Sequence, residues 1–232
     1  MGIALDETIR TEDATLALMP EERTVEIVAV IDFETTGLSP AQGDRATEIA
    51  AVLLEGGKVV DRYQSLMNAG VRIPSYIEAL TGISNSMIRK APEAAEVMQE
   101  VSDFVGDYPL VAHNASFDCK FWDAELARIN RTRPQEFACS MLLSRRLFPQ
   151  APSHKLGALV EYANLPVAGR YHRALADAEM AASLLAKLIE ELRNRYEVSE
   201  VSHELLCKIQ RTPKHQVDRC IQRHRQEGSV AR

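Results

Sequence analysis

The sequence has few cysteines and no long apolar run. Its four cysteines form no C-x-x-C pair and do not indicate a disulfide framework. No apolar stretch approaches the length of a membrane-spanning helix. The first 23 residues are acidic and lack the cationic region of a secretory signal, and Asp6 stands where a myristoylation signal has Ser or Thr. We therefore expect a cytoplasmic protein with reduced thiols and no membrane partner.

An excess of positive charge is also missing. The formal net charge of −6 argues against a protein that coats nucleic acid through bulk charge. The charge is unevenly spread, because residues 195–232 carry eight Lys and Arg against five Asp and Glu, which leaves −9 for residues 1–194. The 46% hydrophobic content and the length of 232 residues are typical of one globular domain with extensions. We expect an acidic body with a basic tail.

Hydrophobic periodicity predicts a mixed α/β fold. Strands are predicted over 28–33, 47–54 and 59–66, the last two joined by a tight turn, and a fourth short strand over 110–113. Helices are predicted over 75–80, 84–89, 92–105, 116–129, 139–148, 153–162 and 174–195. Strands first, then helices with one strand between them, indicate a mixed sheet flanked by helices. Two apolar trios with helical spacing in the tail predict a pair of small helices packed on the body.

Two acids interrupt the first predicted strand. Asp32 and Glu34 lie two positions apart, so both side chains leave the same face of a strand. Neighbouring carboxylates repel, and such a pair is stable on a buried strand when one is protonated or when a cation lies between them. The alternative is a strand end with two solvated acids.

Two further acids stand at the heads of apolar stripes on predicted helices. Asp118 is followed on one helix face by Phe121 and Trp122, and Asp177 is followed at helical spacing by Ala181 and Leu184. Each acid has an alternative explanation, because a carboxylate in a first turn stabilises a helix through its dipole. Two buried helix faces and a strand that all carry acids favour a shared site.

His172 lies five residues before Asp177, a spacing that separates the two side chains on a helix. His172 can join the site only from the loop that precedes the helix; otherwise it is a solvated loop histidine, the interpretation that we keep for the other five. Four carboxylates are ligands for Mg²⁺ or Mn²⁺, and two such ions serve phosphoryl displacement. A nearby imidazole would take the proton from the attacking water.

Three stretches in this order, IDFETTGL, HNASFD and HRALADAE, closely resemble the exonuclease motifs of the DEDDh 3′→5′ exonucleases. The likeness is strongest to the proofreading epsilon subunit of bacterial DNA polymerase III and its free-standing relatives, and LTGIS and SHKLGAL are also similar. The resemblance implies a ribonuclease H-like domain over residues 24–195, between an N-terminal extension (1–23) and a basic helical extension (196–232). It implies two Mg²⁺ or Mn²⁺ ions and a substrate of nucleic-acid 3′ ends, with single-stranded DNA favoured.

The resemblance assigns three kinds of role. It makes four acids the metal ligands: Asp32, Glu34, Asp118 and Asp177. It makes His172 the general base. The residues that it places against the terminal nucleotide are Thr35, Gly37 and Leu38. No acid of the pattern is missing, which argues against an inactive relative. Two alternatives stay open: an enzyme of RNA ends or short oligoribonucleotides, and a module tethered to a polymerase. The sequence shows neither a long flexible linker nor a clamp-binding peptide.

Overall fold

We describe residues 26–167, 169 and 171–230 of a computed structural model, so the expected N-terminal extension (1–23) lies outside the described residues. Five strands form one sheet: β1 (Ile27–Thr35), β2 (Ala46–Glu55), β3 (Lys58–Leu66), β4 (Leu110–Ala112) and β5 (Phe137–Cys139). Their order is β3-β2-β1-β4-β5. β1, β2 and β3 pair antiparallel, whereas β4 and β5 run parallel to β1. The expected mixed sheet is confirmed.

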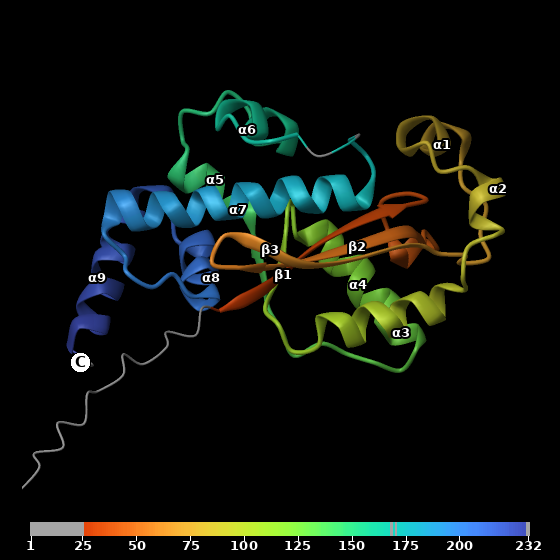
Figure 1. Cartoon of the computed structure of the whole chain (residues 1–232), viewed down its shortest axis with the longest axis horizontal. Coiled ribbons are helices and arrows are strands. Elements are labelled where there is room, and N and C mark those ends of the chain that lie inside the picture. Colours follow the sequence, from red (N-terminus) through yellow and green to blue (C-terminus); the bar gives the residue numbers. More distant parts are fainter. Residues whose placement is uncertain (1–25, 168, 170, 231–232) are drawn as a thin grey trace, which may run out of the picture.

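Helices cover both faces of this sheet (Figure 1). α3 (Ala94–Val105) and α4 (Ser116–Arg128) pack on one face, and α5 (Ser140–Leu147), α6 (Leu156–Tyr162) and α7 (Ala174–Tyr196) on the other. The alternation of β1 explains the two cores, because Val28 and Val30 join the α7 side while Ala29 and Ile31 join the α3–α4 side. α1 (Ser75–Thr81) and α2 (Asn85–Ile88) extend beyond one end.

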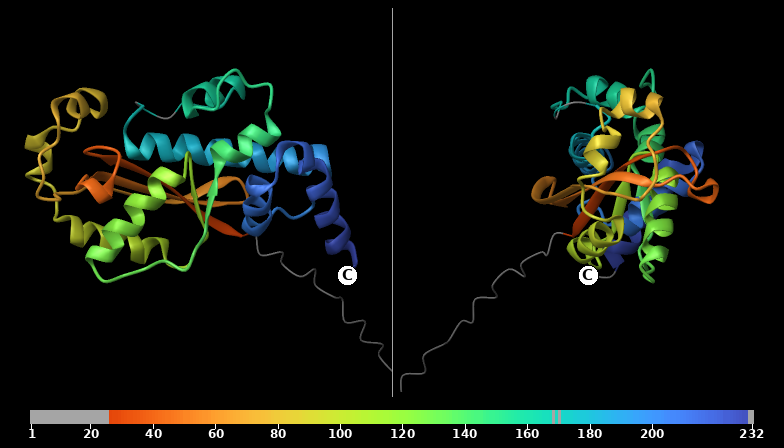
Figure 2. Two further views of the ribbon diagram at one scale, coloured as in Figure 1. Left: turned by 180° about the vertical axis from the view of Figure 1, so that it is seen from behind. Right: turned by 90° about the vertical axis from the view of Figure 1, so that its right-hand side faces the viewer.

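The chain ends in two helices, α8 (His203–Arg211) and α9 (Val217–Val230), at the end of the molecule away from α1 and α2 (Figures 1 and 2). Leu206, Ile209 and Ile221 are buried in the same core as α7, so the expected pair of packed helices is confirmed. The Gln210 side chain extends the sheet edge: its amide donates to the carbonyl of Phe137 at 2.9 Å, and its oxygen accepts the N–H of Cys139 at 2.6 Å.

Several element boundaries differ from expectation. β5 was not predicted, because its three residues run directly into the apolar pattern of the helix that follows. The helix expected over 139–148 therefore begins at Ser140. Ser153 does not cap the next helix, which begins at Leu156, and the helix expected from Pro92 begins at Ala94. Along the described residues, no helix is both long and apolar enough to cross a membrane.

Two histidines interpreted as solvated are structural instead. His113 is partly buried, with Nδ1 2.9 Å from the Ser140 hydroxyl and Nε2 3.0 Å from the carbonyl of His154. His203 is buried, with Nε2 2.9 Å from the carbonyl of Leu110. The expectation of free loop histidines is wrong for both, because partners distant in sequence occupy their ring nitrogens.

Candidate active site

The carboxylates of β1 stand at its carboxyl end, beside the parallel strand β4. Asp32 and Glu34 extend the α7-facing side of β1, as the two-residue spacing predicted. The backbone N–H of Phe33, between them, donates to Asp118 Oδ1 at 3.2 Å. The first turn of α4 is thereby fixed against the strand. Asp118 is buried, and Phe121 and Trp122 pack beneath it as its apolar stripe predicted.

His172 and Asp177 lie on either side of the start of α7. The helix begins at Ala174, so His172 belongs to the preceding loop, as expected, and Asp177 to the first turn. The backbone N–H of His172 donates to Asp177 Oδ2 at 3.1 Å. His172 has a φ of +60°, a left-handed conformation that is uncommon for a non-glycine residue and is frequent at functional sites. The ring is exposed.

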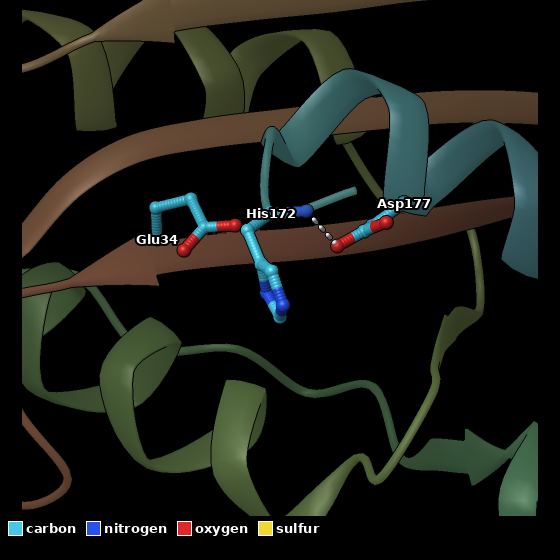
Figure 3. Close-up of side chains that lie close together, drawn as sticks. All are labelled: Glu34, His172 and Asp177. Carbon is cyan, nitrogen blue, oxygen red and sulfur yellow. Dashed lines mark hydrogen bonds between the residues drawn. The ribbon is translucent and has the colours of Figure 1, made fainter. Parts of the chain in front are cut away.

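Glu34, His172 and Asp177 converge from two sequence regions, the end of β1 and the start of α7. One carboxylate oxygen of each acid and one ring nitrogen of His172 all lie within 4.8 Å of one another. Figure 3 shows His172 between Glu34 on the strand and Asp177 on the helix. Asp177 Oδ1 is buried without a hydrogen-bond partner in the described part of the chain. A buried unsatisfied carboxylate oxygen, beside a second carboxylate, is suited to a hard divalent cation, so the residues present fit Mg²⁺ or Mn²⁺.

Electrostatics tie all four acids into one cluster. Burial raises the pKa of Asp32 well above its ordinary value, and the charges of Asp118 and Asp177 raise it further. Burial, with the charge of Asp177, also raises the pKa of Glu34 to about 8, and burial raises that of Asp118 to about 8. Burial raises the pKa of Asp177 too, opposed by the hydrogen bond from His172. Ionising this cluster is costly unless a cation is present.

Glu48 is the site residue that the sequence interpretation missed. It lies on β2 directly opposite Glu34 and is fully buried. Its carboxylate receives two hydrogen bonds from the Arg173 guanidinium, at 2.8 and 3.1 Å, and one from the backbone N–H of Ala174 at 3.1 Å. The amide of Gln64 donates a fourth at 2.7 Å. Glu48 thus fixes the residues that directly follow His172; a charge inside an apolar strand was the available signal.

The loop after β1 holds the residues expected against a terminal nucleotide. The Thr35 hydroxyl donates to the carbonyl of Gly37 at 2.6 Å. A Cβ on Gly37 would lie 2.4 Å from the Asp44 carboxylate oxygens, so a larger residue there would displace the Asp44 side chain. Leu38 is 75% exposed, and the Lys120 ammonium donates to its carbonyl at 3.1 Å. This loop therefore exposes the apolar side chain of Leu38, while Lys120 of α4 holds its backbone.

The mixed sheet, the flanking helices and the carboxylates at the end of β1 define a ribonuclease H-like nuclease fold. A family model described as exonuclease matches residues 29–185. The chain belongs to this exonuclease family.

Relatives and solved structures agree with this placement. Over 165 residues the chain is 38% identical to the 3′-5′ exonuclease DinG of Bacillus subtilis (71% of this chain, 18% of DinG). Over 168 residues it is 36% identical to a PolC-type DNA polymerase III of Bacillus cereus (72% of this chain, 12% of that protein). It therefore spans less than a fifth of either relative.

Among solved structures, exonuclease X in complex with 5′ overhanging duplex DNA has a TM-score of 0.59 and 30% identity. That match covers 70% of this chain and 91% of exonuclease X. The nuclease domain of 3′hExo, a DEDDh family member bound to rAMP, has a TM-score of 0.62 at 21% identity, covering 72% of this chain and 93% of that domain. At that identity the second likeness bears on the fold alone.

Proposed function

We propose that this chain is a 3′→5′ exonuclease that hydrolyses the terminal phosphodiester bond of single-stranded DNA and releases nucleoside 5′-monophosphates. The observation that supports this most directly is the convergence of Glu34, His172 and Asp177 within 4.8 Å, beside Asp32 and Asp118, in a chain of the exonuclease family. Its four cysteines are free thiols, in keeping with a cytoplasmic setting.

In this proposal four carboxylates hold two divalent ions, Mg²⁺ or Mn²⁺; they are Asp32, Glu34, Asp118 and Asp177. When bound, such ions stabilise the charge on the attacking and leaving oxygens of the displacement. The chain places these acids on rigid elements, since β1, α4 and α7 are packed in the core around them. The Phe33 N–H holds Asp118, and the His172 N–H holds Asp177.

His172 acts as the general base in this proposal. Its exposed ring, on the loop before α7, is accessible to a water molecule from the solvent side. A ring nitrogen lies within 4.8 Å of a carboxylate oxygen of Glu34 and of Asp177, so the imidazole stands beside the acids that would hold the ions. Arg173 and Glu48 hold the adjoining backbone, so the ring is presented from a fixed position.

The terminal nucleotide would lie against Thr35, Gly37 and Leu38. Leu38 offers exposed apolar surface to a base, and Gly37 lies beside it in the same loop. The 3′ end, rather than an internal bond, is then the position recognised. A further phosphate at the 3′ position would add negative charge beside the carboxylates and should slow hydrolysis.

The test is hydrolysis of 5′-labelled linear single-stranded DNA by the purified chain. We expect 3′→5′ shortening with Mg²⁺ or Mn²⁺, none in EDTA, and poor cutting of 3′-phosphorylated ends. Asp32→Ala should be inactive while Asp107→Ala, which changes an exposed acid, should match the parent. Equal cutting of circular and linear strands, or full activity in EDTA, would overturn the proposal. Faster hydrolysis of the matching RNA oligomer would assign the site to RNA ends instead.

The PolC-type relatives motivate a second role, as a nuclease associated with a polymerase. The name belongs to proteins of which this chain spans about an eighth, so the association needs its own experiment. Co-purification of the full chain with a replicative polymerase, in the parent and in Asp32→Ala, would detect such an assembly independently of catalysis.

A further inference from the structure

A second feature with chemical character lies far from the carboxylates, between α8 and α9. Here the structure has a groove of about 620 Å³, which we call the basic groove. Its cations come in two pairs: Lys208 and Arg211 on α8, and Arg219 and Arg223 on α9. Three- and four-residue spacing puts each pair on one helix face, so the two faces converge on one groove.

The basic groove is locally positive in an acidic protein. All four cations are exposed, and the lining acids are Glu136, which pairs with Arg211, and Glu204. Positive charge on both walls of a groove attracts a polyanion more strongly than the same charges scattered over a surface. A phosphodiester backbone carries a negative charge on every nucleotide, so its charge is complementary to this groove and its linear form matches the groove's shape.

The groove is built into the fold. Its walls are fixed from below by the buried residues Leu206 and Ile221 and by the bonds from Gln210 to β5. α9 is also tied to the end of α7, because the Tyr196 hydroxyl donates to Asp218 at 2.7 Å and Arg225 pairs with Glu197 at 2.7 Å. A preformed groove binds without first ordering its own helices, which favours affinity.

The basic groove and the candidate active site lie at opposite ends of α7 (Figures 1 and 2). His172 and Asp177 adjoin its first turn, while α9 is bonded to its last residue. A helix of 23 residues is about 35 Å long. A stacked strand with about 3.4 Å between nucleotides would need about ten of them to cover that span.

We propose that the basic groove binds the phosphodiester backbone of the nucleic-acid substrate, upstream of the 3′ end that is hydrolysed. This rests on the proposed function, because the occupant is the strand whose end enters the carboxylate site. The groove then gives the enzyme a preference for long strands over short oligomers, since short ones occupy the carboxylate site without reaching the groove.

The test compares the parent with Arg219→Glu/Arg223→Glu. The matched control is Lys58→Glu/Lys187→Glu, which makes the same change in charge outside the groove. Binding of labelled single strands of about 30 and about 4 nucleotides is measured by fluorescence anisotropy in EDTA, over a salt series. We expect at least tenfold weaker binding of the long strand to the groove variant, and unchanged binding of the short one. The slope of log affinity against log salt should fall by about 1.4, from two lost phosphate contacts.

Other results would overturn the inference. Unchanged affinity for the long strand, an equal loss in the control, or an equal loss on the short strand would each remove the groove as a strand-binding site. Thermal melting checks the fold, and Arg219→Gln/Arg223→Gln replaces the charge reversal if that variant melts early. Binding is measured without metal, so it does not depend on nuclease activity. If the parent shows no nuclease activity but the groove variant still binds the long strand more weakly, the groove remains a strand-binding site and the proposed function is rejected.

Discussion

The buried Glu48 carboxylate and the Arg173 guanidinium form a two-point ion pair, at 2.8 and 3.1 Å, that joins the first residues of β2 to the residue after His172. The pair crosses 125 positions of sequence. Because the same carboxylate accepts the N–H of Ala174, it fixes both the loop and the first turn of α7. The His172 ring and the Asp177 carboxylate are thereby held against Glu34. Glu48 is a positioning residue in this interpretation, one step away from the reacting atoms.

Glu48→Gln should therefore lower kcat by about 10²-fold, the cost of misplacing a catalytic group by about 1 Å. Breaking a buried ion pair also costs about 3–5 kcal/mol of stability. Leu206→Ala, a core truncation in α8 that costs a similar amount, is the matched control and should keep the parental kcat. Steady-state kinetics beside urea unfolding separates the two effects. A kcat that falls equally in both variants would make Glu48 merely structural.

The stability of the metal-free protein should fall as pH rises from about 4.5 to about 8, and the fall should end above that pH. The pKa values of Glu34 and Asp118 are raised to about 8 from ordinary values of 4.5 and 3.8, mainly by burial. In this window the folded protein holds protons that the unfolded chain has lost, so the slope of stability against pH is negative. Melting in EDTA should show the decline, and Asp118→Asn should lessen it. Mg²⁺ should raise the melting temperature more at pH 8.5 than at pH 6.5. A rise in stability over this window would contradict the assignment.

At acid pH a buried histidine should oppose these carboxyl groups. Burial lowers the pKa of His113 to about 4 from an ordinary 6.5. The unfolded chain binds this proton first, so the contribution of His113 to stability is lost as pH falls from about 6.5 to about 4, by about 3 kcal/mol, against the gain from the protonated carboxyl groups of Glu34 and Asp118. His113→Gln should remove that part of the acid dependence, whereas His215→Gln, at an exposed position, should keep it. Urea unfolding at intervals of pH measures the difference, and identical acid profiles for the parent and His113→Gln would refute it.

The terminal helices should be required for the fold. Gln210 occupies the open edge of β5, with its oxygen 2.6 Å from the N–H of Cys139. Gln210→Ala leaves these buried backbone groups unsatisfied and should cost about 1–3 kcal/mol, whereas Gln222→Ala at an exposed position should cost little. Chemical denaturation compares the two. Equal stability of both variants would show that the bonds from Gln210 do not stabilise the edge of β5.

The parts predictable from the sequence are those with local periodicity. β1, β2 and β3 and the long helix α7 each carry enough apolar residues to mark their faces, and Asp118 and Asp177 were recognised as acids at the heads of buried stripes. β5 could not be found, because its three residues are defined by pairing with β4 rather than by their own pattern. Non-local pairing leaves no period in the sequence.

The supporting contacts of the site were equally invisible. An acid within an apolar strand drew attention to Asp32 and Glu34. Glu48 has the same signal, but its role follows from its ion pair with Arg173. No local sequence pattern joins Glu48 to Arg173. The basic tail was recognised by composition, whereas the groove between α8 and α9 depends on how those helices pack. The charged residues can be counted from the sequence, but the surface on which they gather depends on the fold.

The last prediction separates His172 from the acids. Its ring nitrogen lies close enough to Glu34 and Asp177 to be a metal ligand as well as a base. If it is the base, His172→Ala should bind Mn²⁺ like the parent while kcat falls by about 10²–10⁴-fold. The hydrogen bond to Asp177 comes from the backbone of residue 172, so the substitution keeps it.

The backbone conformation sets the design of this experiment. Because φ is +60° at this position, His172→Asn, which tolerates left-handed backbone, is the companion that removes strain as an explanation. Asp32→Ala should lose Mn²⁺ binding as well as activity, since a hard cation depends on carboxylate oxygens. Calorimetric titration with Mn²⁺ is read beside single-turnover cleavage. Loss of Mn²⁺ binding in His172→Asn would show that the ring is a metal ligand. Cleavage at the parental rate in this variant would show that the ring takes no part in the reaction.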